Sequence, residues 1–283
     1  MISAKIISIV NQKGGVGKTT TAINLSASLA HYGQKCLLID LDPQANTTSG
    51  LGLNKTSVDQ SIYQVILGEL PLSSVIRPTG VDNLDIVPSN INLVGAEIEL
   101  ISVENRELSL LRAFQPCQND YKYIFIDCPP SLGLLTVNAL SAADSVIIPV
   151  QCEYFAMEGV SQLLQTIELI QKNFNPSLRI EGVVLTMYDC RVNLSGQVID
   201  EIKKFFNDTV FETLIPRNIR LAEAPSFGKP ALLYDSASRG AQVYLDLAVE
   251  VMEINNTWER QPVIDERRPD PQTEAQQTEH SVS

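Results

Sequence analysis

Near the start of the chain stands the stretch Lys13-Gly14-Gly15-Val16-Gly17-Lys18-Thr19-Thr20. It follows the apolar run Ile6–Val10, which predicts a strand, and it precedes Thr21–His31, which predicts a helix. Glycines let backbone N–H groups converge on an anion, and a helix start adds unpaired donors and partial positive charge. The pattern therefore predicts a phosphate cradle, in which Lys18 reaches the β- and γ-phosphates and Thr19 ligates Mg²⁺.

The loop departs from the ordinary P-loop pattern at its first position. That pattern requires a glycine at position 12, where this chain has Gln12, and Lys13 adds a second lysine at the start of the loop. The alternative interpretation is a chance glycine-rich turn. The strand before the loop and the helix after it favour the phosphate cradle.

The composition is that of a large folded domain. The chain has 283 residues, of which 44% are hydrophobic and 19% charged, enough for one large α/β domain or two small ones. We expect no signal peptide and no bilayer-spanning segment. The five cysteines are scattered without a CxxC pair, which indicates reduced thiols in a cytosolic protein, and the two histidines form no metal pattern.

The formal net charge is −12. This charge argues against a protein that coats nucleic acid through its bulk charge. It leaves room for a local basic patch, because exposed charges are screened beyond about 8 Å at physiological salt.

Apolar strand-like runs alternate with helical runs along most of the sequence. The expected strands are Ile6–Val10, Lys35–Asp40, Leu84–Val87, Tyr123–Asp127, Ser145–Val150, Arg179–Leu185 and Val210–Ile215. The expected helices are Thr21–His31, Ser57–Leu67, Ile91–Ile101, Arg106–Phe114, Leu132–Leu140, Phe155–Phe174, Asn193–Phe206 and Ser236–Ile254. This alternation predicts an α/β fold with a doubly wound, mostly parallel sheet.

The composition changes near the C-terminal end. Residues 257–283 are rich in Gln, Glu, Pro, Thr and Arg and hold few apolar side chains. Such a segment buries too little surface to offset the entropy of ordering. We therefore expect one domain over residues 1–256 and a disordered polar tail over residues 257–283.

Acidic residues close two of the expected strands. Asp40 and Asp42 stand at the end of the second strand, and Asp127 closes the fourth. Ligands of open α/β sheets bind outside the carboxyl ends of the strands, so acids there, after a phosphate loop, indicate handling of Mg²⁺ or water. We expect one of the first two acids to order the turn and Asp42, further past the strand, to be functional. We expect Asp127 to be the carboxylate on the Mg²⁺ side of the site. The alternative is that Asp127 is the N-cap of helix Leu132–Leu140.

Four motifs stand in order along the chain. They are Lys13–Thr20, Leu38-Ile39-Asp40-Leu41-Asp42-Pro43-Gln44, Phe125-Ile126-Asp127-Cys128-Pro129-Pro130 and Pro216-Arg217-Asn218. Together they resemble the ParA/Soj chromosome- and plasmid-partition ATPases, the deviant-Walker-A group that includes MinD. The resemblance covers about residues 3 to 254. It implies the P-loop NTPase fold of that group and an Mg²⁺-dependent ATPase switch that converts ATP to ADP and phosphate.

The resemblance also implies roles for the loop and its acids. ATP would be sandwiched between two subunits, and Lys13 would reach across to the phosphates of the second subunit and offset charge in phosphoryl transfer. Lys18 would bind the phosphates, and Asp42 would orient the attacking water. The implied metal site comprises Thr19, Asp42 and Asp127. The remaining implied nucleotide contacts are Gly14, Gly15, Val16, Gly17, Thr20, Pro216 and Asn218, the last two at the adenine.

Soj-like members bind DNA without sequence preference as ATP-bound dimers. The matching basic residues are Arg191 and Arg220, with Lys203 and Lys204 as further candidates. A few contacts to phosphates give salt-dependent affinity, and dimerisation doubles the patch. The alternative is that these are solvated surface charges. Cys190 stands where many relatives carry another basic residue, which predicts weaker DNA binding.

The implied partners are a second copy of the chain, double-stranded DNA and a ParB-type centromere-binding protein, with the protein in the cytoplasm on the nucleoid. Other functions stay open. One is a ParA-like ATPase that positions a protein cargo on the nucleoid. A MinD-like membrane switch requires a basic amphipathic C-terminal helix, and the acidic, proline-bearing tail argues against it. A small-molecule ligase or kinase of this fold needs a substrate pocket for which no motif is seen, and a cluster-carrying redox protein needs paired cysteines.

Overall fold

The computed structural model describes residues 4–114, 119–153, 156–189 and 191–257. The chain divides into two compact units, residues 1–250 and 251–283, and the fold and sites below belong to the first. The expected tail, residues 257–283, lies outside the described residues except for Thr257. Among the described helices, none has both the length and the apolar character that crossing a bilayer requires.

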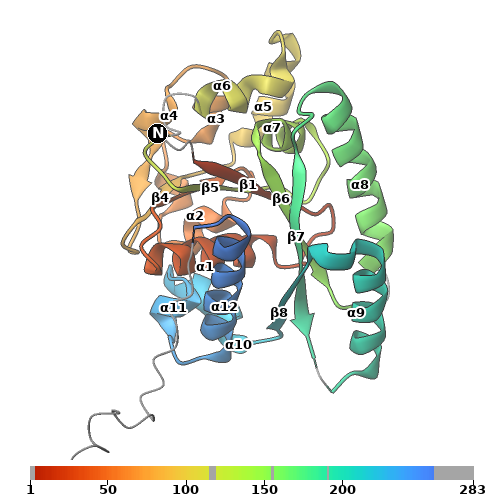
Figure 1. The fold of residues 1–283 in the computed structure, drawn as a ribbon. Helices are drawn as coiled ribbons and strands as arrows, with labels where there is room; N and C mark the ends of the chain where they lie inside the picture. Colours follow the sequence, from red (N-terminus) through yellow and green to blue (C-terminus); the bar gives the residue numbers. More distant parts are fainter. Residues whose placement is uncertain (1–3, 115–118, 154–155, 190, 258–283) are drawn as a thin grey trace, which may run out of the picture. The chain divides into compact units, whose positions relative to one another are not determined.

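An eight-stranded sheet with the order β3-β4-β2-β5-β1-β6-β7-β8 forms the centre of the first unit (Figure 1). The strands are β1 (Lys5–Ile9), β2 (Cys36–Asp40), β3 (Arg77–Pro78), β4 (Leu84–Val87), β5 (Tyr123–Asp127), β6 (Ser145–Gln151), β7 (Arg179–Tyr188) and β8 (Val210–Pro216). Neighbouring strands pair in parallel, except that β3 runs antiparallel to β4 at one edge. The predicted mostly parallel sheet is confirmed.

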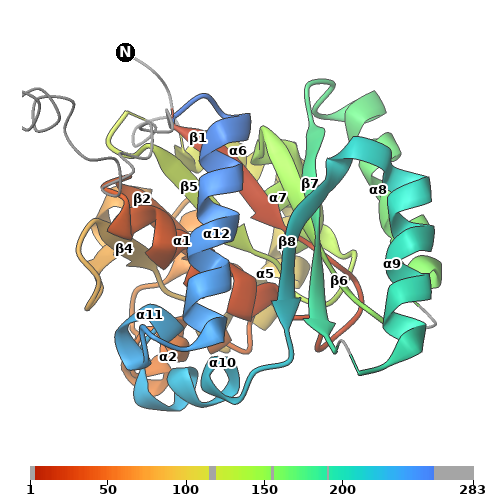
Figure 2. The same ribbon diagram turned by 60° about the horizontal axis from the view of Figure 1, so that its bottom comes forward.

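Helices cover both faces of the sheet, so it is doubly wound as predicted (Figure 2). Helix α1 packs on β2 and β5 on one face, whereas α7, α8 and α9 pack on β1, β6 and β7 on the other. The helices are α1 (Lys18–His31), α2 (Asn46–Gly50), α3 (Ile62–Ile66), α4 (Leu72–Val75), α5 (Leu93–Glu99), α6 (Ser109–Phe114), α7 (Leu134–Ala142), α8 (Ala156–Asn173), α9 (Asn193–Phe206), α10 (Ile219–Glu223), α11 (Ala231–Tyr234) and α12 (Arg239–Ile254). Short 3₁₀ turns are η1 (Lys55–Ser57), η2 (Leu100–Ser102), η3 (Arg106–Leu108), η4 (Asn207–Thr209) and η5 (Ala224–Phe227).

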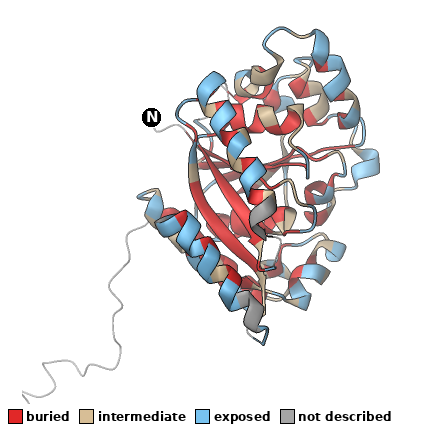
Figure 3. Ribbon diagram, turned by 90° about the vertical axis from the view of Figure 1, so that its right-hand side faces the viewer, coloured by how far each residue is buried: buried red, intermediate tan, exposed pale blue. Residues whose placement is uncertain are grey.

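The central strands are buried along their whole length. Every residue of β2 and of β5 is buried, and Figure 3 shows the sheet in red beneath helices whose outer faces are exposed. Strands covered on both faces read as near-continuous apolar runs instead of alternating patterns. This burial explains why these strands could be predicted to within one residue.

One predicted helix is wrong in its first half. The expected helix Ser57–Leu67 is replaced by η1 and then by α3, which begins only at Ile62. Ser61 is the N-cap of α3: its Oγ accepts from Tyr63 N (3.3 Å), while Gln64 Oε1 accepts from Ser61 N (2.9 Å). This reciprocal capping box satisfies donors at the helix start, and it fixes the start at a place that apolar spacing alone does not reveal.

The start of α7 excludes one interpretation of Asp127. The helix begins at Leu134 with Gly133 as its N-cap residue, six residues after Asp127, so the N-cap alternative for this acid is wrong. The short elements β3, α2, α4, α10 and α11 were not predicted, because each spans five residues or fewer and its position depends on tertiary contacts.

Candidate functional site

The glycine-rich loop connects β1 to α1 at the carboxyl edge of the sheet. Gly15 and Gly17 have φ of +75° and +91°, in the left-handed region that favours glycine, and Gly17 is the N-cap residue of α1. A Cβ atom at Gly14 or Gly15 would meet nothing within 4 Å. The space above the loop is therefore open, and the first N–H groups of α1 face it without intrahelical partners.

Hydrogen bonds from three elements hold the loop. Asn11 Nδ2 donates to a carbonyl of β6 (2.8 Å), and Gln12 Nε2 donates to a carbonyl of α8 (3.1 Å). Thr186 Oγ1, on β7, donates to the carbonyl of Val16 (2.8 Å). Gln12, the departure from the ordinary pattern, therefore anchors the loop to α8. A loop tied in this way offers its donors to an anion with little rearrangement.

The two loop lysines lie in different surroundings. Lys18 is buried, and its Nζ donates to the carbonyl of Lys13 (3.0 Å). Burial lowers the pKa of Lys18, partly offset by the charges of Asp127 and Asp42. The Lys13 ammonium is more exposed and lies 3.6 Å from the Glu153 carboxylate. A buried cation with no full counter-ion is attracted strongly to an incoming anion.

Asp127 stands at the end of β5 with one oxygen bonded and one free. Its Oδ2 accepts from Thr19 Oγ1 (2.8 Å) and from Thr47 Oγ1 (2.6 Å). Its Oδ1 is buried and has no hydrogen-bond partner within the described residues. Burial raises the pKa of Asp127 to about 6, with hydrogen bonds from the two threonines acting in the opposite direction. A buried, unpartnered carboxylate oxygen beside a threonine hydroxyl suits a hard cation.

These donors fit an Mg²⁺ ion that keeps other ligands. Mg²⁺ is commonly bound through one or two protein oxygens plus substrate phosphates and water. The described residues contain no group of three or more His, Cys, Asp or Glu side chains that could form a complete protein cage. Thr19 and Asp127 supply two oxygens, and the open loop leaves room for phosphate.

Asp40 and Asp42 differ in their hydrogen bonds and in their position relative to the end of β2. Asp40 is fully buried, and its Oδ2 accepts from Thr48 N (2.8 Å) and Thr48 Oγ1 (2.6 Å), which ties α2 to the end of β2. Burial, together with the charge of Asp127, raises its pKa to about 7. Asp42 lies beyond the strand, where its Oδ1 accepts from Gln44 N (2.9 Å), and it raises the pKa of Asp127. Asp40 thus orders the turn, while Asp42 stands near both Asp127 and Lys18.

Thr47 is the site residue that the sequence did not reveal. Its helix, α2, has five residues and begins after Ala45, whose φ is +53°. That turn delivers the Thr47 hydroxyl to Asp127 and the Thr48 hydroxyl to Asp40. The sequence signal for Thr47 was the pair of hydroxyl residues shortly after Asp42. Such a pair identifies a site residue only once its tertiary contacts are known.

The predicted adenine contacts line a pocket of about 210 Å³ between α1, β8 and α10. Its walls include Thr20, Met187, Pro216, Asn218 and Tyr244. The residues Gly14, Gly15 and Lys13 are outside this pocket, at the phosphate end of the same loop. Asn218 Oδ1 accepts from a backbone N–H of α10 (2.8 Å), so its side-chain NH₂ is the group available to an adenine ring nitrogen.

The predicted DNA contacts are exposed, and the arginines already have acidic partners. Arg191 Nη2 lies 2.7 Å from Asp189 Oδ2, and this contact lowers the pKa of Asp189 to about 2. Arg220 pairs with Glu223 (2.9 Å) and with Asp235 (3.1 Å). Cys190 lies outside the described residues.

The two candidate lysines stand apart from the Arg191 loop. Lys203 and Lys204 are exposed in the last turn of α9, roughly 15 Å along the helix from its start at Asn193. Arg191 stands two residues before that start, so the arginine and the lysines lie at opposite ends of α9, which Figure 2 shows as one continuous helix.

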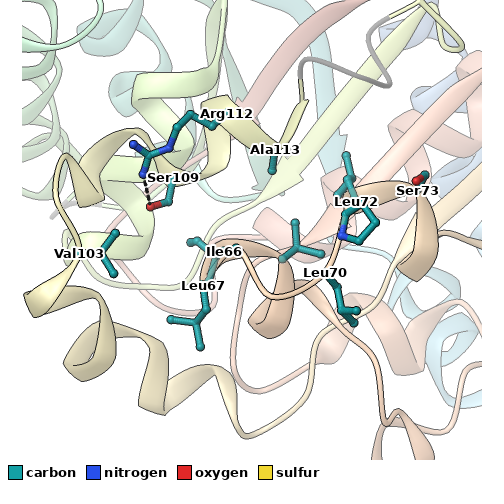
Figure 4. A pocket seen from close by; sticks show the side chains of 12 residues that line it. Ile66, Leu67, Leu70, Leu72, Ser73, Val103, Ser109, Arg112 and Ala113 are labelled. Atoms are coloured by element: carbon teal, nitrogen blue, oxygen red, sulfur yellow. Dashed lines mark hydrogen bonds between the residues drawn. The ribbon is translucent and has the colours of Figure 1, made fainter.

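A separate apolar cleft of about 260 Å³ shares no residue with the phosphate or adenine sites. It lies between α3, α4 and α6, and Leu67, Leu70, Leu72 and Val103 line it (Figure 4). Arg112 reaches over one side, where its Nη2 donates to Ser109 Oγ (3.1 Å).

Comparison with known proteins agrees with this geometry. The AAA-domain family matches residues 4–180. Sporulation initiation inhibitor protein Soj of Bacillus subtilis is 60% identical over 247 residues, 87% of this chain and 98% of that protein. Chromosome partitioning protein ParA of Myxococcus xanthus is 53% identical over 248 residues, 88% of each chain. The structure of cobyrinic acid a,c-diamide synthase from Mycobacterium smegmatis, with bound ATP analogue and magnesium, is 35% identical with a TM-score of 0.80, covering 92% of this chain and 98% of that one.

A sheet of this order, with a lysine-bearing glycine loop after β1 and a carboxylate closing β5, defines the P-loop ATPase fold of the ParA/MinD group. The fold that was expected from the motifs is therefore confirmed. The chain belongs to the Soj/ParA family of chromosome-partitioning proteins.

Proposed function

We propose that this chain is an Mg²⁺-dependent ATPase of chromosome or plasmid partition, whose ATP-bound form dimerises and binds DNA without sequence preference. The observation that carries the proposal is the buried Lys18 ammonium beside the free Asp127 oxygen, above an open glycine loop. Within the described residues the Asp127 oxygen has no hydrogen-bond partner, and a nucleoside triphosphate with its metal would bring ionic partners to both groups. Family membership with Soj and ParA supports the partition role.

The phosphate end binds and orients the triphosphate. The loop N–H groups and the start of α1 hold the phosphate oxygens, and Lys18 holds the β- and γ-phosphates. Thr19 and Asp127, the latter directly or through water, would hold Mg²⁺, which would neutralise phosphate charge when bound. Thr47 fixes the Asp127 carboxylate by donating to the same oxygen as Thr19.

Asp42 orients the water that attacks the γ-phosphate. Its carboxylate lies at the open end of β2, close enough to Lys18 and Asp127 to change the pKa of both. An acceptor placed there aligns a water by hydrogen bonding, and positioning is the main contribution a protein makes to phosphoryl transfer.

Lys13 acts across a dimer interface. Its exposed pair with Glu153 is of the kind that contributes little to stability, so the ammonium can leave it at small cost. In the dimer it offsets charge on the phosphates bound by the second subunit. The rest of the nucleotide lies in the adenine pocket, where Pro216 packs on the base and Asn218 donates to it.

Arg191 and Arg220 bind DNA phosphates by exchanging their present carboxylate partners for phosphate oxygens. The exchange keeps each guanidinium paired, and the release of counterions from DNA favours it at low salt. Lys203 and Lys204 add contacts at the far end of α9. Because ATP joins two copies, the patch doubles only in the ATP state. A ParB-type protein is the partner that stimulates hydrolysis, with the complex on the nucleoid.

The experiment is sedimentation of the purified chain with ATP, ADP or no nucleotide, each with and without nonspecific double-stranded DNA. The proposal expects dimers and DNA retention when ATP is present, and neither with ADP or without nucleotide. A chain that stays monomeric with ATP and ignores DNA would instead fit a small-molecule enzyme of this fold, like the synthase named above.

Asp42→Ala is the matching variant. Loss of water positioning should lower hydrolysis on the order of 100-fold, while ATP affinity changes less than about threefold and the dimer persists on DNA. The control is Asp59→Ala, an exposed acid outside the site. Rapid turnover by Asp42→Ala would remove the assigned role.

A further inference from the structure

The apolar cleft between α3, α4 and α6 is lined by side chains at two depths. Val65, Ile66 and Leu72 are at most 2% exposed. Leu67 and Leu70 also line the cleft, but they are only half-buried while packing against the same core. The cleft therefore presents apolar surface that a ligand would remove from water, which favours binding.

Backbone hydrogen bonds hold the turn after α3, which forms one wall of the cleft. Gly68 has φ of +78°, and its N–H donates to the carbonyl of Val65 (3.0 Å). The next two N–H groups, of Glu69 (2.9 Å) and Leu70 (3.3 Å), both donate to the carbonyl of Gln64. A wall that is fixed in this way loses little entropy when a ligand enters.

Among the described residues that line the cleft, a single one is charged, and it is a cation. Arg112, on α6, donates through Nη2 to Ser109 Oγ (3.1 Å) and to the carbonyl of Asn105 (3.4 Å). Both acceptors are neutral, and the arginine ion pairs within the described residues all involve other arginines. A guanidinium has five N–H donors, so Arg112 keeps donors for an anion. Figure 4 shows Arg112 beside the apolar side chains, with its bond to Ser109.

The volume of the cleft limits its occupant to a small molecule. The cleft measures about 260 Å³. At about 30 Å³ for a group of the size of water or a methylene, it holds roughly eight or nine heavy atoms. Pockets for drug-sized ligands begin at about 300 Å³, and a helix of another protein is about 10 Å wide. The cleft is therefore too small for an element of a partner protein.

The combination of apolar walls with one cation selects the chemistry of that molecule. A neutral hydrocarbon would fill the cleft and leave the guanidinium donors unused. A cationic molecule would be repelled by Arg112. A molecule with an apolar body and one carboxylate satisfies both parts, because guanidinium and carboxylate match in geometry and form charge-assisted hydrogen bonds.

We propose that this cleft is a binding site for a small apolar carboxylate of the size of a medium-chain fatty acid. Its aliphatic chain lies against Leu67 and Leu70, and its carboxylate pairs with Arg112. This inference goes beyond the proposed function and does not depend on it, since the cleft shares no residue with the phosphate or adenine sites.

The test titrates sodium octanoate at neutral pH into the full-length chain with isotope-labelled leucine and valine methyl groups, which are followed by NMR. The methyl signals of Leu67, Leu70 and Val103 should shift with one saturable affinity of about 1 mM or tighter, which roughly ten non-hydrogen atoms can supply. Octanamide has the same size without the charge and should bind at least about fivefold more weakly. Hexanoate, which is shorter by two methylenes, should bind about tenfold more weakly than octanoate.

Two variants and a control locate the site. Arg112→Gln keeps a donor for Ser109 but removes the charge, so octanoate affinity should fall at least about fivefold, to the level of octanamide. Ala113→Leu places a larger side chain in the cleft and should weaken octanoate binding about tenfold. Arg179→Gln removes an exposed cation on β7, outside the cleft, and should change octanoate affinity less than about twofold. Urea unfolding checks that each variant is folded.

Equal affinity for octanoate and octanamide, or unchanged octanoate affinity in Arg112→Gln, would overturn the proposal, because the cation would then contribute nothing to recognition. Octanoate that shifts methyl signals only outside the cleft, or gives no saturable shifts at several times about 1 mM, would overturn it as well. ATP-dependent DNA retention, measured in parallel, reports on the proposed function separately. Saturable shifts at the cleft in a chain that does not retain DNA would uphold this inference and reject the proposed function.

Discussion

The phosphate end of the site and the basic edge near β7 and β8 are built in opposite ways. At the phosphate end, Lys18 and Thr19 begin α1, Asp127 ends β5 and Thr47 lies in α2, and hydrogen bonds fix them. At the basic edge, Arg191 and Arg220 are exposed and bonded to acids within a few residues of themselves or on a neighbouring turn.

The difference shows where each part of the function obtains its specificity. A buried oxygen or ammonium with a missing partner strongly favours one kind of ligand, because its unpaired state is costly. An ion pair between an exposed arginine and a carboxylate contributes little to stability. That contribution also depends little on the exact position of the two side chains. We therefore expect the phosphate end to select its ligand by geometry, and the proposed DNA contacts at the basic edge to depend on charge and salt for any polyanion.

The largest effect should come from the phosphate end. Lys18→Ala removes the buried cation and should lower ATP affinity on the order of 100-fold or more, since a charge-assisted contact inside a protein is lost without replacement. Equilibrium binding of labelled ATP measures it. Lys35→Ala, at the opposite end of β2, is the control, and urea unfolding checks that both variants fold. Near-normal affinity in Lys18→Ala would break the contrast between the two regions.

The basic edge should respond to charge and to salt together. Combining Arg191→Glu with Arg220→Glu removes four arginine contacts from a dimer, which should reduce the slope of log affinity against log salt by about four and lower DNA affinity at least tenfold. ATP affinity should stay within about twofold. Arg179→Glu, an exposed residue at the other end of β7, should leave DNA binding almost unchanged. Unchanged DNA retention by the double variant would refute the patch.

Asp127 should make the nucleotide-free protein less stable as pH rises. Its pKa is about 6 when folded and 3.8 as the reference value, so the folded state binds the proton more tightly. The resulting stability is present below about pH 4 and lost as pH rises through 6. Asp127→Asn can keep both threonine bonds through its amide oxygen and removes the titration. Between pH 4 and 7 the unfolding free energy of wild type should fall by on the order of 1–3 kcal/mol more than that of the variant.

Urea unfolding at several pH values measures that difference. Asp82→Asn, an exposed acid, should retain the wild-type slope. Parallel slopes for wild type and Asp127→Asn would mean that the buried carboxyl does not titrate in this range.

The smallest effect belongs to a residue that connects the two regions. Glu153 lies 3.6 Å from Lys13 and 4.0 Å from Arg217, and all three side chains are exposed to solvent. Glu153→Gln removes an ion pair worth about 0–1 kcal/mol, so ATP affinity and dimerisation should rise less than about threefold. Calorimetric titration with ATP and sedimentation measure both. A tenfold change would show that the pair restrains Lys13 strongly, and the contrast between fixed and loose charges would need revision.

The fold was predictable where burial dictated the sequence. Strands β2 and β5 are apolar without interruption because both faces are covered, and the glycine loop is recognisable because its backbone conformation requires Gly15 and Gly17. The helix expected at Ser57 failed because a capping box at Ser61 decides the start of α3. Thr47 escaped notice because its contact with Asp127 spans 80 positions in the chain, which local patterns do not encode. The acidic partners of Arg191 and Arg220 depend on turn geometry in the same way.

A backbone hydrogen bond joins the turn that follows β8, which lines the proposed adenine pocket, to the end of β7, which precedes Arg191. Arg217 N donates to the carbonyl of Tyr188 (3.1 Å), one residue before Asp189, and β7 and β8 end side by side at Tyr188 and Pro216. The proposed base pocket and the proposed polyanion contact therefore lie at neighbouring ends of one pair of strands. If the proposed function holds, emptying the base pocket would therefore weaken polyanion binding directly through these strand ends.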